Sequence, residues 1–305
     1  MAIRMDGSTI VEVRGVNHRQ ELEPVLLDIA KAKYHPLPGG EKFDKKSEDM
    51  KHVTLLTKKQ EKGESMTRED LTFLYEIDSQ IEGFGYEKDP RIKELRNQRN
   101  PKEDMQVIFD CTKAEIAHNA DEITPTTKAY VGTLFPGIFS TNIEHIYTAF
   151  PEGKLQTYNI EIGTKTKEEY TQALIEKNIE ISGYAQNLLD APDFVTLPSG
   201  EQCALVRLSV SDLGFPNGAT TDEIYNRADE WGLELCPPET GPALRLATDS
   251  PDWMVIGMKQ ITDQGGGPSV FDLPRLGGGL WLGTLVAEPA YRWSAYDRFV
   301  FRTRK

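Results

Sequence analysis

The chain has 305 residues with a net charge of -13, and 38% of its residues are hydrophobic. This length accommodates one large domain or two to three small ones. No apolar run approaches the roughly 18 residues that a membrane-spanning helix needs, so we expect a soluble globular protein. Basic residues occur in mixed-sign stretches such as 86–104 rather than along one stripe, which argues against a nucleic-acid interface.

The cysteines and the first residues bear on the cellular compartment. Cys111, Cys203 and Cys236 are odd in number and far apart, so they form neither a zinc pattern nor a disulfide framework. Buried thiols in a reducing cytoplasm are expected instead. Residues 1–13 lack a basic region followed by a long apolar core, so no secretory signal is expected. We therefore expect the protein in the cytoplasm, although display on the cell surface by another route stays open.

The first of three expected segments, residues 1–66, contains few sequence patterns that predict secondary structure strongly. A strand is expected at 9–15 and an apolar helical patch at 22–32. Residues 34–52 combine proline, glycine and dense charge, which suits a linker, and 56–65 are also polar. We therefore expect this segment to be loosely ordered, with little core of its own.

The second segment, 67–191, is expected to be a helical module followed by a small α+β module. Thr67 and Asp70 resemble a capping box for a helix that runs to about Ile81. Asp89 before Pro90, and Asn100 before Pro101, predict two further helix starts. Alternation of β-branched and aromatic residues then predicts short strands, and a helix follows. The strands are placed within 127–135, 142–150 and 155–163, and the helix at 167–178.

The third segment, 192–305, is expected to be an α+β domain with most of its strands at the end. A strand at 204–210 precedes a helix that starts at Thr220 or Thr221 and closes at Gly232. Glycine, proline and aspartate turns then separate short strands. These are expected at 243–247, 252–261, 269–273, 279–283 and 298–303. The fold class predicted for the chain is α+β.

Several residues that could carry chemistry have a simpler structural interpretation. His118 and His145 have no second ligand at metal-binding spacing, so structural or surface histidines are favoured. The lysine- and glycine-containing stretch 35–47 lacks the order of a phosphate-binding loop, and the glycine runs near residues 266 and 278 suit turns between strands. Asp263, Asp272, Glu288 and Asp297 do not have the spacing of a known calcium loop. No catalytic residue, metal or cofactor is expected.

Trp281 and Trp293 have two possible roles. They are either core anchors or a platform on which a sugar ring stacks. Small and apolar neighbours flank each of them, which favours core anchoring.

The last 37 residues carry a more specific pattern. The stretch 269–305 resembles the variable region of target proteins of diversity-generating retroelements, especially those of candidate-phyla bacteria and nanoarchaea. The residues that carry the resemblance are Leu280, Trp281, Leu282, Pro289, Arg292, Trp293, Phe299, Val300, Phe301 and Arg302. Segments 69–104 and 213–246 also resemble uncharacterised proteins of candidate-phyla bacteria. The resemblance therefore touches most of residues 66–305.

The resemblance implies a mechanism that acts on the gene. In this family an error-prone reverse transcriptase replaces template adenines, so diversified codons exclude Lys, Gln, Glu, Met and Trp. The composition of the tail fits that restriction. The diversified, ligand-binding positions implied here are Ser269, Asp272, Leu276, Gly278, Gly283, Thr284, Leu285, Ala290, Tyr291, Ser294, Tyr296 and Asp297. Val286 and Glu288 depart from the family pattern, and Pro274 and Ala295 fit it poorly.

The family also implies a C-type-lectin-like fold for residues 192–305. Such a domain tolerates varied side chains only where they leave the core untouched. We therefore expect Trp281, Trp293, Phe299 and Phe301 to be buried, and the diversified positions from Gly283 onward to face solvent together. Phe299 and Phe301 are expected on one face of a strand, and Val300 and Arg302 on the other.

These observations predict a non-enzymatic ligand-binding protein whose ligand is macromolecular, in the first place a protein. Tyrosine with small residues is also typical of antibody-like binding surfaces. Two alternatives stay open. One is a carbohydrate-binding module that uses Trp281 and Trp293. The other is an enzyme of the formylglycine-generating branch of the same fold, for which Cys203 and Cys236 have to converge.

Overall fold

The computed structural model describes residues 2–7, 9–14, 27–37, 39–85, 87–250 and 252–304. Their contacts divide the chain into two compact units, residues 1–113 (unit 1) and 114–305 (unit 2). The sequence suggested boundaries near 66 and 191 instead. Strand β6 (Gln156–Ile162) precedes residue 191 but pairs with β8 (Glu201–Ser209), so the expected second boundary falls inside one sheet.

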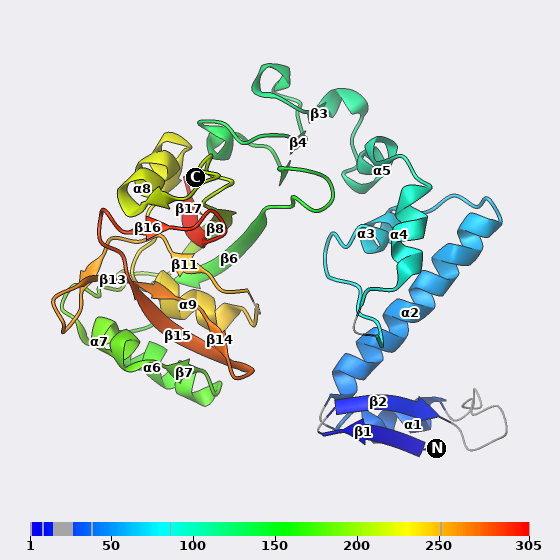
Figure 1. The fold of residues 1–305 in the computed structure, drawn as a ribbon, viewed down its shortest axis with the longest axis horizontal. Helices are drawn as coiled ribbons and strands as arrows, with labels where there is room; N and C mark the ends of the chain where they lie inside the picture. Colours follow the sequence, from blue (N-terminus) through cyan, green and yellow to red (C-terminus); the bar gives the residue numbers. More distant parts are fainter. Residues whose placement is uncertain are drawn as a thin grey trace. The chain divides into compact units, whose positions relative to one another are not determined.

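Unit 1 combines an antiparallel strand pair with a group of helices (Figure 1). Its elements are β1 (Ala2–Asp6), β2 (Thr9–Arg14), α1 (Leu27–Tyr34), α2 (Gly40–Glu61), α3 (Arg68–Leu74), α4 (Pro90–Asn97) and α5 (Pro101–Ile108). The expected strand at 9–15 is present apart from residue 15, and the expected helical patch at 22–32 is helical from residue 27. Residues 15 and 22–26 lie outside the described residues.

Helix α2 corrects the expectation of a loosely ordered linker. Its 22 residues cover most of the two stretches expected to be linker-like. Phe43, Val53 and Leu56 are buried along one side of it, and lysine and glutamate between them are good helix formers. Dense charge therefore marked the solvated face of a helix, and the prolines that suggested a linker precede the first turn.

The helix starts predicted in the second segment are confirmed. Thr67 and Asp70 form the reciprocal hydrogen bonds of a capping box, and the side chains of Asp89 and Asn100 cap α4 and α5. Helix α3 is shorter than expected, because Glu76 adopts a left-handed backbone conformation just after it.

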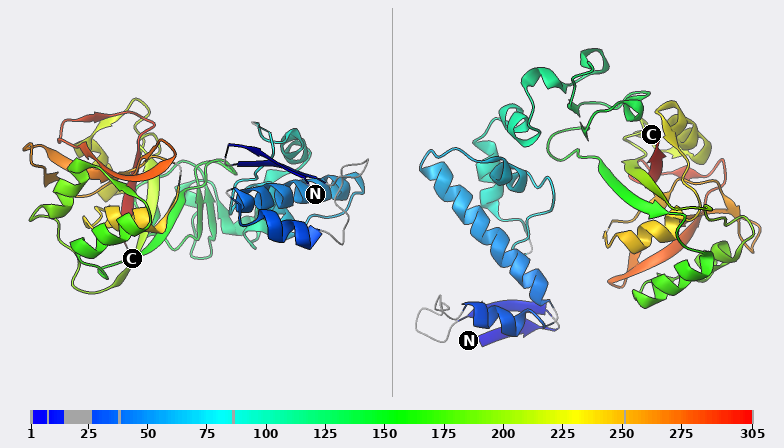
Figure 2. Two further views of the ribbon diagram at one scale, coloured as in Figure 1. Left: turned by 90° about the horizontal axis from the view of Figure 1, so that it is seen from below. Right: turned by 180° about the vertical axis from the view of Figure 1, so that it is seen from behind.

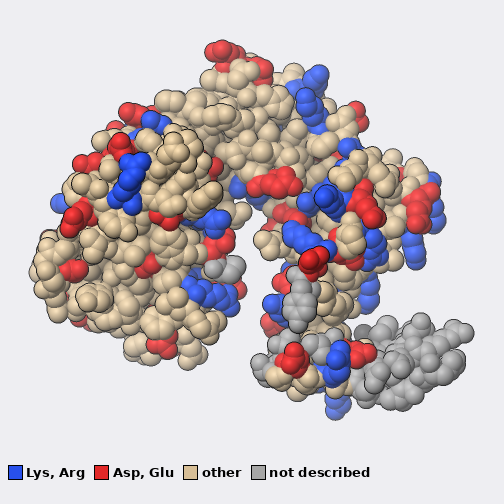
Figure 3. Space-filling view, in the orientation of Figure 1, with Lys and Arg blue, Asp and Glu red and all other residues tan. Residues whose placement is uncertain are grey.

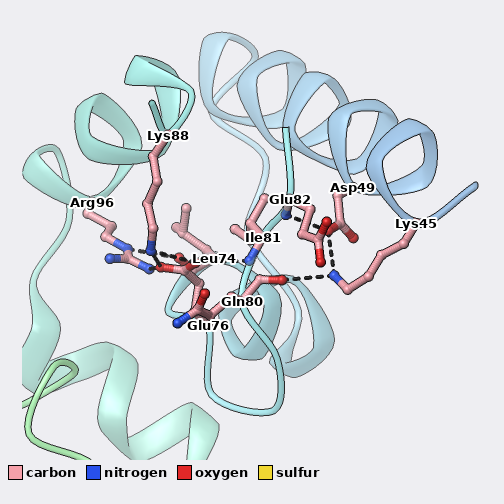
Figure 4. A network of polar contacts seen from close by, with 9 residues as sticks. All are labelled: Lys45, Asp49, Leu74, Glu76, Gln80, Ile81, Glu82, Lys88 and Arg96. Carbon is pink, nitrogen blue, oxygen red and sulfur yellow. Dashed lines mark hydrogen bonds and ion pairs between the residues drawn. The ribbon is translucent and has the colours of Figure 1, made fainter. Parts of the chain in front are cut away.

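The segment after α3 is held by two carboxylates (Figure 4). Glu76 accepts hydrogen bonds from the backbone of Ile81 and from Lys88, and it pairs with Arg96. Asp49 of α2 accepts from the backbone of Glu82 at 2.8 Å. These charges close a loop against two helices and have a structural role.

Unit 2 contains a small parallel sheet and a large mixed sheet. The small sheet has the order β3–β4–β5, with β3 (Ile116–Ala117), β4 (Ala129–Val131) and β5 (His145–Tyr147). The large sheet has the main path β14–β15–β13–β11–β17–β8–β6. Its remaining members are β11 (Val255–Ile256), β13 (Pro268–Asp272), β14 (Arg275–Leu276), β15 (Gly279–Val286) and β17 (Arg298–Thr303). Short strands β7 (Glu180–Ile181), β10 (Leu233–Glu234) and β12 (Ile261–Thr262) join from the side.

The α-helices described in unit 2 are α6 (Lys167–Glu176), α7 (Gly183–Asp190), α8 (Thr221–Glu230) and α9 (Thr240–Ala247). Helices α6 and α7 lie near β15 in both sets of views (Figures 1 and 2). Helix α9 replaces the strand expected at 243–247. Ala, Leu and Arg are good helix formers, and Pro242 fits a first helical turn, so local preference agrees with the observed helix.

Strand β17 is central in the large sheet, since it pairs antiparallel with β8 and parallel with β11. Phe299 and Phe301 are buried as expected, but Val300 is buried as well, because both faces of this strand are covered. The mixture of helices with a curled mixed sheet confirms the α+β class. No helix in the described part of the chain combines the length and apolar character needed to span a bilayer.

Candidate ligand-binding surface

Residues 287–297, here called the C-terminal loop, join β15 to β17. Hydrogen bonds from the loop backbone to neighbouring segments hold it in place. The carbonyls of Pro289 and Tyr291 accept hydrogen bonds from the N–H groups of Asp222 and Thr221 at 3.1 and 3.0 Å. Those donors belong to the first turn of α8, where helical N–H groups have no partner within the helix. The loop therefore satisfies groups that the helix leaves unpaired.

The end of the C-terminal loop is held in the same way. The carbonyls of Ala295 and Asp297 accept from the N–H groups of Ser211 and Val210, both at 2.9 Å. Between the two halves, β16 (Arg292–Trp293) pairs with β9 (Ala219–Thr220). A backbone held at both ends and in the middle does not need the outward side chains to keep its shape.

Arg292 and Trp293 fix the centre of the loop. The Trp293 ring is buried and donates from Nε1 to the Thr221 hydroxyl at 2.9 Å. The Arg292 guanidinium donates to the carbonyls of Asn217 and Gly218. Gly218 has a left-handed backbone, and a Cβ there would overlap the Trp293 carbonyl, so β9 approaches β16 this closely only with glycine.

Four of the implied ligand-binding residues are exposed on this loop. Ala290 and Ser294 are small, while Tyr291 and Tyr296 are 46% and 86% exposed. The Tyr291 ring lies edge-on to Trp293, with centroids 4.8 Å apart. Asp297 is half-buried, and its carboxylate accepts from the backbone of Ser294 at 2.8 Å, so it shapes the turn instead of facing a ligand freely.

A cavity of about 350 Å³ lies beside Tyr296. Polar side chains dominate its lining, and they come from β6, β8, β17 and the segment before β6. Arg207 and Arg298 reach this cavity and both pair with Asp252, at 2.8 and 3.2 Å. Sequence reasoning missed these groups, because they are far apart in the chain and carry no shared motif.

Three implied positions do not face solvent. Ser269, Asp272 and Gly283 are buried. The Ser269 hydroxyl donates to Asp263, and Asp272 accepts from Trp253 Nε1 at 2.7 Å. Burial raises the pKa of the Asp272 carboxyl. Asp272 stands opposite Gly283 in the β13–β15 ladder, and a Cβ at Gly283 would overlap its carboxylate.

Strand geometry separates the other implied positions. Gly283, Thr284 and Leu285 lie consecutively in β15, so Thr284 points to the opposite face from its two neighbours. Thr284 and Leu285 are half-buried. The expectation that the three face solvent together is therefore not met.

Leu276 is the last residue of β14, and Gly278 lies in the tight turn that leads to β15. Both are exposed, but β15 separates them from the C-terminal loop, and its eight residues span roughly 23 Å at 3.3 Å per step. Gly278 also has a left-handed backbone, which few other residues adopt without strain. These two positions are therefore remote from the cluster formed by Ala290, Tyr291, Ser294 and Tyr296.

The aromatic residues expected to be buried differ in their burial. Trp293, Phe299 and Phe301 are buried, whereas Trp281 is half-buried. Trp281 lies in β15 and Trp293 in β16, and the buried Trp293 ring is not available to stack on a sugar. The arrangement therefore gives no shared tryptophan platform of the kind that the carbohydrate-binding alternative requires.

Cys203 and Cys236 lie on opposite edges of β17. Cys203 belongs to β8, which pairs with one edge, and the Cys236 thiol donates to the Val300 carbonyl from the other. Both cysteines are buried thiols, and no disulfide joins them. Burial also raises the pKa of the Cys236 thiol, which disfavours a reactive thiolate.

The remaining candidates have local structural roles. His118 contacts the Val131 carbonyl through its ring, and the Asp263 carboxylate accepts from the backbone of Gly265 and Gly267 within one turn. Among the residues that the structure describes, no cluster of three or more His, Cys, Asp or Glu side chains is arranged to hold a metal ion.

Charges of both signs are interspersed on the face shown in Figure 3. Comparison of the chain with models of protein families, with curated proteins and with solved structures found no match.

Proposed function

We propose that this protein is a non-enzymatic ligand-binding protein that displays retroelement-diversified side chains on the C-terminal loop. The observation that carries the proposal is the separation of backbone from side chains in this loop. Carbonyls of Pro289, Tyr291, Ala295 and Asp297 fix the chain, while the side chains of Ala290, Tyr291 and Tyr296 point to solvent. Such a loop can change its contact chemistry without changing its shape.

The fold of unit 2 that we propose is C-type-lectin-like. Support comes from the position of β17, which pairs inside the mixed sheet between β11 and β8, and from the loop-rich segment between β8 and β17. Binding residues concentrate on loops because a rigid scaffold positions them. In this chain the scaffold is the β8–β17–β11 core, where Leu205, Phe299 and Val255 are buried.

The ligand class that we propose is a protein surface. Tyr291 and Tyr296 offer rigid aromatic contact area, and Ala290 and Ser294 leave room around them. The cavity beside Tyr296 adds Arg207 and Arg298, so a partner that contacts Tyr296 can also offer polar groups to guanidinium donors. Positions Ser269, Asp272 and Gly283 are left out of this binding surface because they are buried.

Sequencing the gene's surroundings in its source tests the proposal. We expect a reverse transcriptase gene and a near-identical repeat of the segment that encodes residues 276–302. Mismatches between the two copies should fall at template adenines and should include the codons of Ala290, Tyr291 and Tyr296. Absence of the repeat, or mismatches spread over all four bases, contradicts diversification.

A further inference from the structure

Arg245 is an unusual residue in unit 2, because its charge is buried without a matching carboxylate. It lies in the last turn of α9 and is 1% exposed. One hydrogen bond is formed, from Nη2 to the carbonyl of Thr248. Its Nε and Nη1 atoms have no hydrogen-bond partner within the described chain. Buried polar groups in folded proteins are nearly always satisfied, so these two donors require an explanation.

The carbonyl end of α9 compensates the charge of Arg245 only in part, and no ion pair completes it. No carboxylate of the described residues forms an ion pair with it. Asp249 and Arg275 both act on it electrostatically, and Arg275 adds a second positive charge while donating to the Asp249 carbonyl at 3.4 Å. Tyr158 of β6 also faces this region as a neutral phenol, and burial raises its pKa. The Asp249 carboxylate thus acts on Arg245 without an ion pair, and the charge of Arg275 opposes it.

We infer that Arg245 binds a small oxyanion, a carboxylate or phosphate group, at the C-terminal end of α9, with Arg275 as the second cation. The planar guanidinium presents its free donors in a fixed geometry that matches two oxygens of such a group. A water molecule would satisfy a donor but would leave the charge uncompensated.

The exposed side of the site gives the direction of entry. Arg275 and Asp249 are both exposed, whereas Arg245, on which both charges act, is buried. An anion attracted by Arg275 therefore approaches over the segment that follows α9. This site is separate from the C-terminal loop, and it does not depend on the proposed function.

Thermal unfolding of the full chain tests the inference. Inorganic phosphate and sodium acetate are titrated at an ionic strength held constant with sodium chloride. We expect a saturable rise in Tm with one of them, because a ligand that binds only the folded state stabilises it. Saturation with phosphate alone identifies a free or phosphoryl anion, and saturation with acetate identifies a carboxylate. No saturable rise with either anion overturns the inference.

Two variants separate specific binding from general screening of charge. Arg245→Met should weaken the anion's apparent affinity at least about tenfold, the loss expected for hydrogen bonds to a charged group. Arg302→Met is the matched control, since Arg302 pairs with Glu201 at 2.8 Å and should leave the anion response unchanged. An equal loss of apparent anion affinity in both variants contradicts a binding site at Arg245.

A second measurement covers the case in which Arg245→Met does not fold. Crystals of the unaltered protein grown in selenate should show anomalous selenium density within hydrogen-bond distance of Arg245 Nε or Nη1. If acetate is the anion that saturates, bromoacetate replaces selenate and bromine density is expected there. A water molecule at that position, or no density with the matching anion, overturns the inference.

Discussion

The indole Nε1 of Trp293 donates a 2.9 Å hydrogen bond to the hydroxyl of Thr221, and both side chains are buried. This bond joins the middle of the C-terminal loop to the first residue of α8. It complements the backbone bonds from Thr221 and Asp222 to the loop carbonyls. The loop and the helix start therefore form one structural unit.

Replacing Thr221 with valine tests this connection. Thr221→Val keeps the shape but leaves the indole N–H buried without an acceptor, so the free energy of unfolding of unit 2 should fall by about 1–3 kcal/mol. Urea unfolding followed by tryptophan fluorescence measures it, because all four tryptophans, at 231, 253, 281 and 293, belong to unit 2. Thr262→Val at an exposed strand position is the control and should change little. Equal stability of the two variants would show that the bond contributes nothing.

Gly283 provides a test of the positions excluded from the binding surface. A Cβ at this position overlaps the Asp272 carboxylate, so Gly283→Ala should destabilise unit 2 by about 1–3 kcal/mol through overpacking. Gly183 at the start of α7 has nothing within 4 Å of an added Cβ, so Gly183→Ala should be neutral or stabilising. The same fluorescence measurement compares them. If Gly283→Ala leaves the free energy of unfolding unchanged, position 283 tolerates a side chain and can again be counted among the diversified positions.

Asp70 in unit 1 gives a pH dependence. Burial alone would raise its pKa, but hydrogen bonds from Lys59, the Thr67 backbone and His52 outweigh burial and lower the pKa to about 2. The folded pKa is below the unfolded value of about 3.9, so the contribution to stability is complete above that value. It is lost as the pH falls from about 4 towards about 2.

Hydrogen exchange in α3 measures this effect. Asp70→Asn should increase exchange of the α3 amides at neutral pH, and its difference from the unaltered protein should shrink as the pH approaches 2 to 3. Asp78→Asn, at an exposed position, is the control. A difference that persists unchanged at low pH would mean that the Asp70 charge has no part in it.

Local signals explain which elements were predictable. Helix starts at Thr67, Asp89 and Asn100 were predicted because a cap and its partner lie within three residues. Strand β17 was predicted at its full length from alternating aromatic residues. Helix α2 was missed because its charged face dominates its composition, and α9 because five apolar or basic residues do not distinguish a strand from a helix.

The candidate site was predictable only in part, for a different reason. Tyr291 and Tyr296 lie in a turn-rich stretch, which indicates exposure. The burial of Ser269, Asp272 and Gly283 depends on the pairing of β13 with β15, and a sequence does not reveal this register. The hydrogen bonds from Thr221 and Asp222 to the loop join residues about 70 positions apart in the chain, so no local sequence pattern predicts them.

A substitution scan of residues 269–303 in the full chain, with the folded fraction as the measured quantity, shows whether the C-terminal loop keeps its shape when its exposed side chains vary. We predict that Ala290, Tyr291 and Tyr296 accept most residue types with little loss of folded protein, because the loop backbone is held without them. Asp272, Gly283 and Trp293 should accept few. If positions 290, 291 and 296 prove as restrictive as Trp293, the C-terminal loop is not a scaffold for varied contacts, and the account is contradicted.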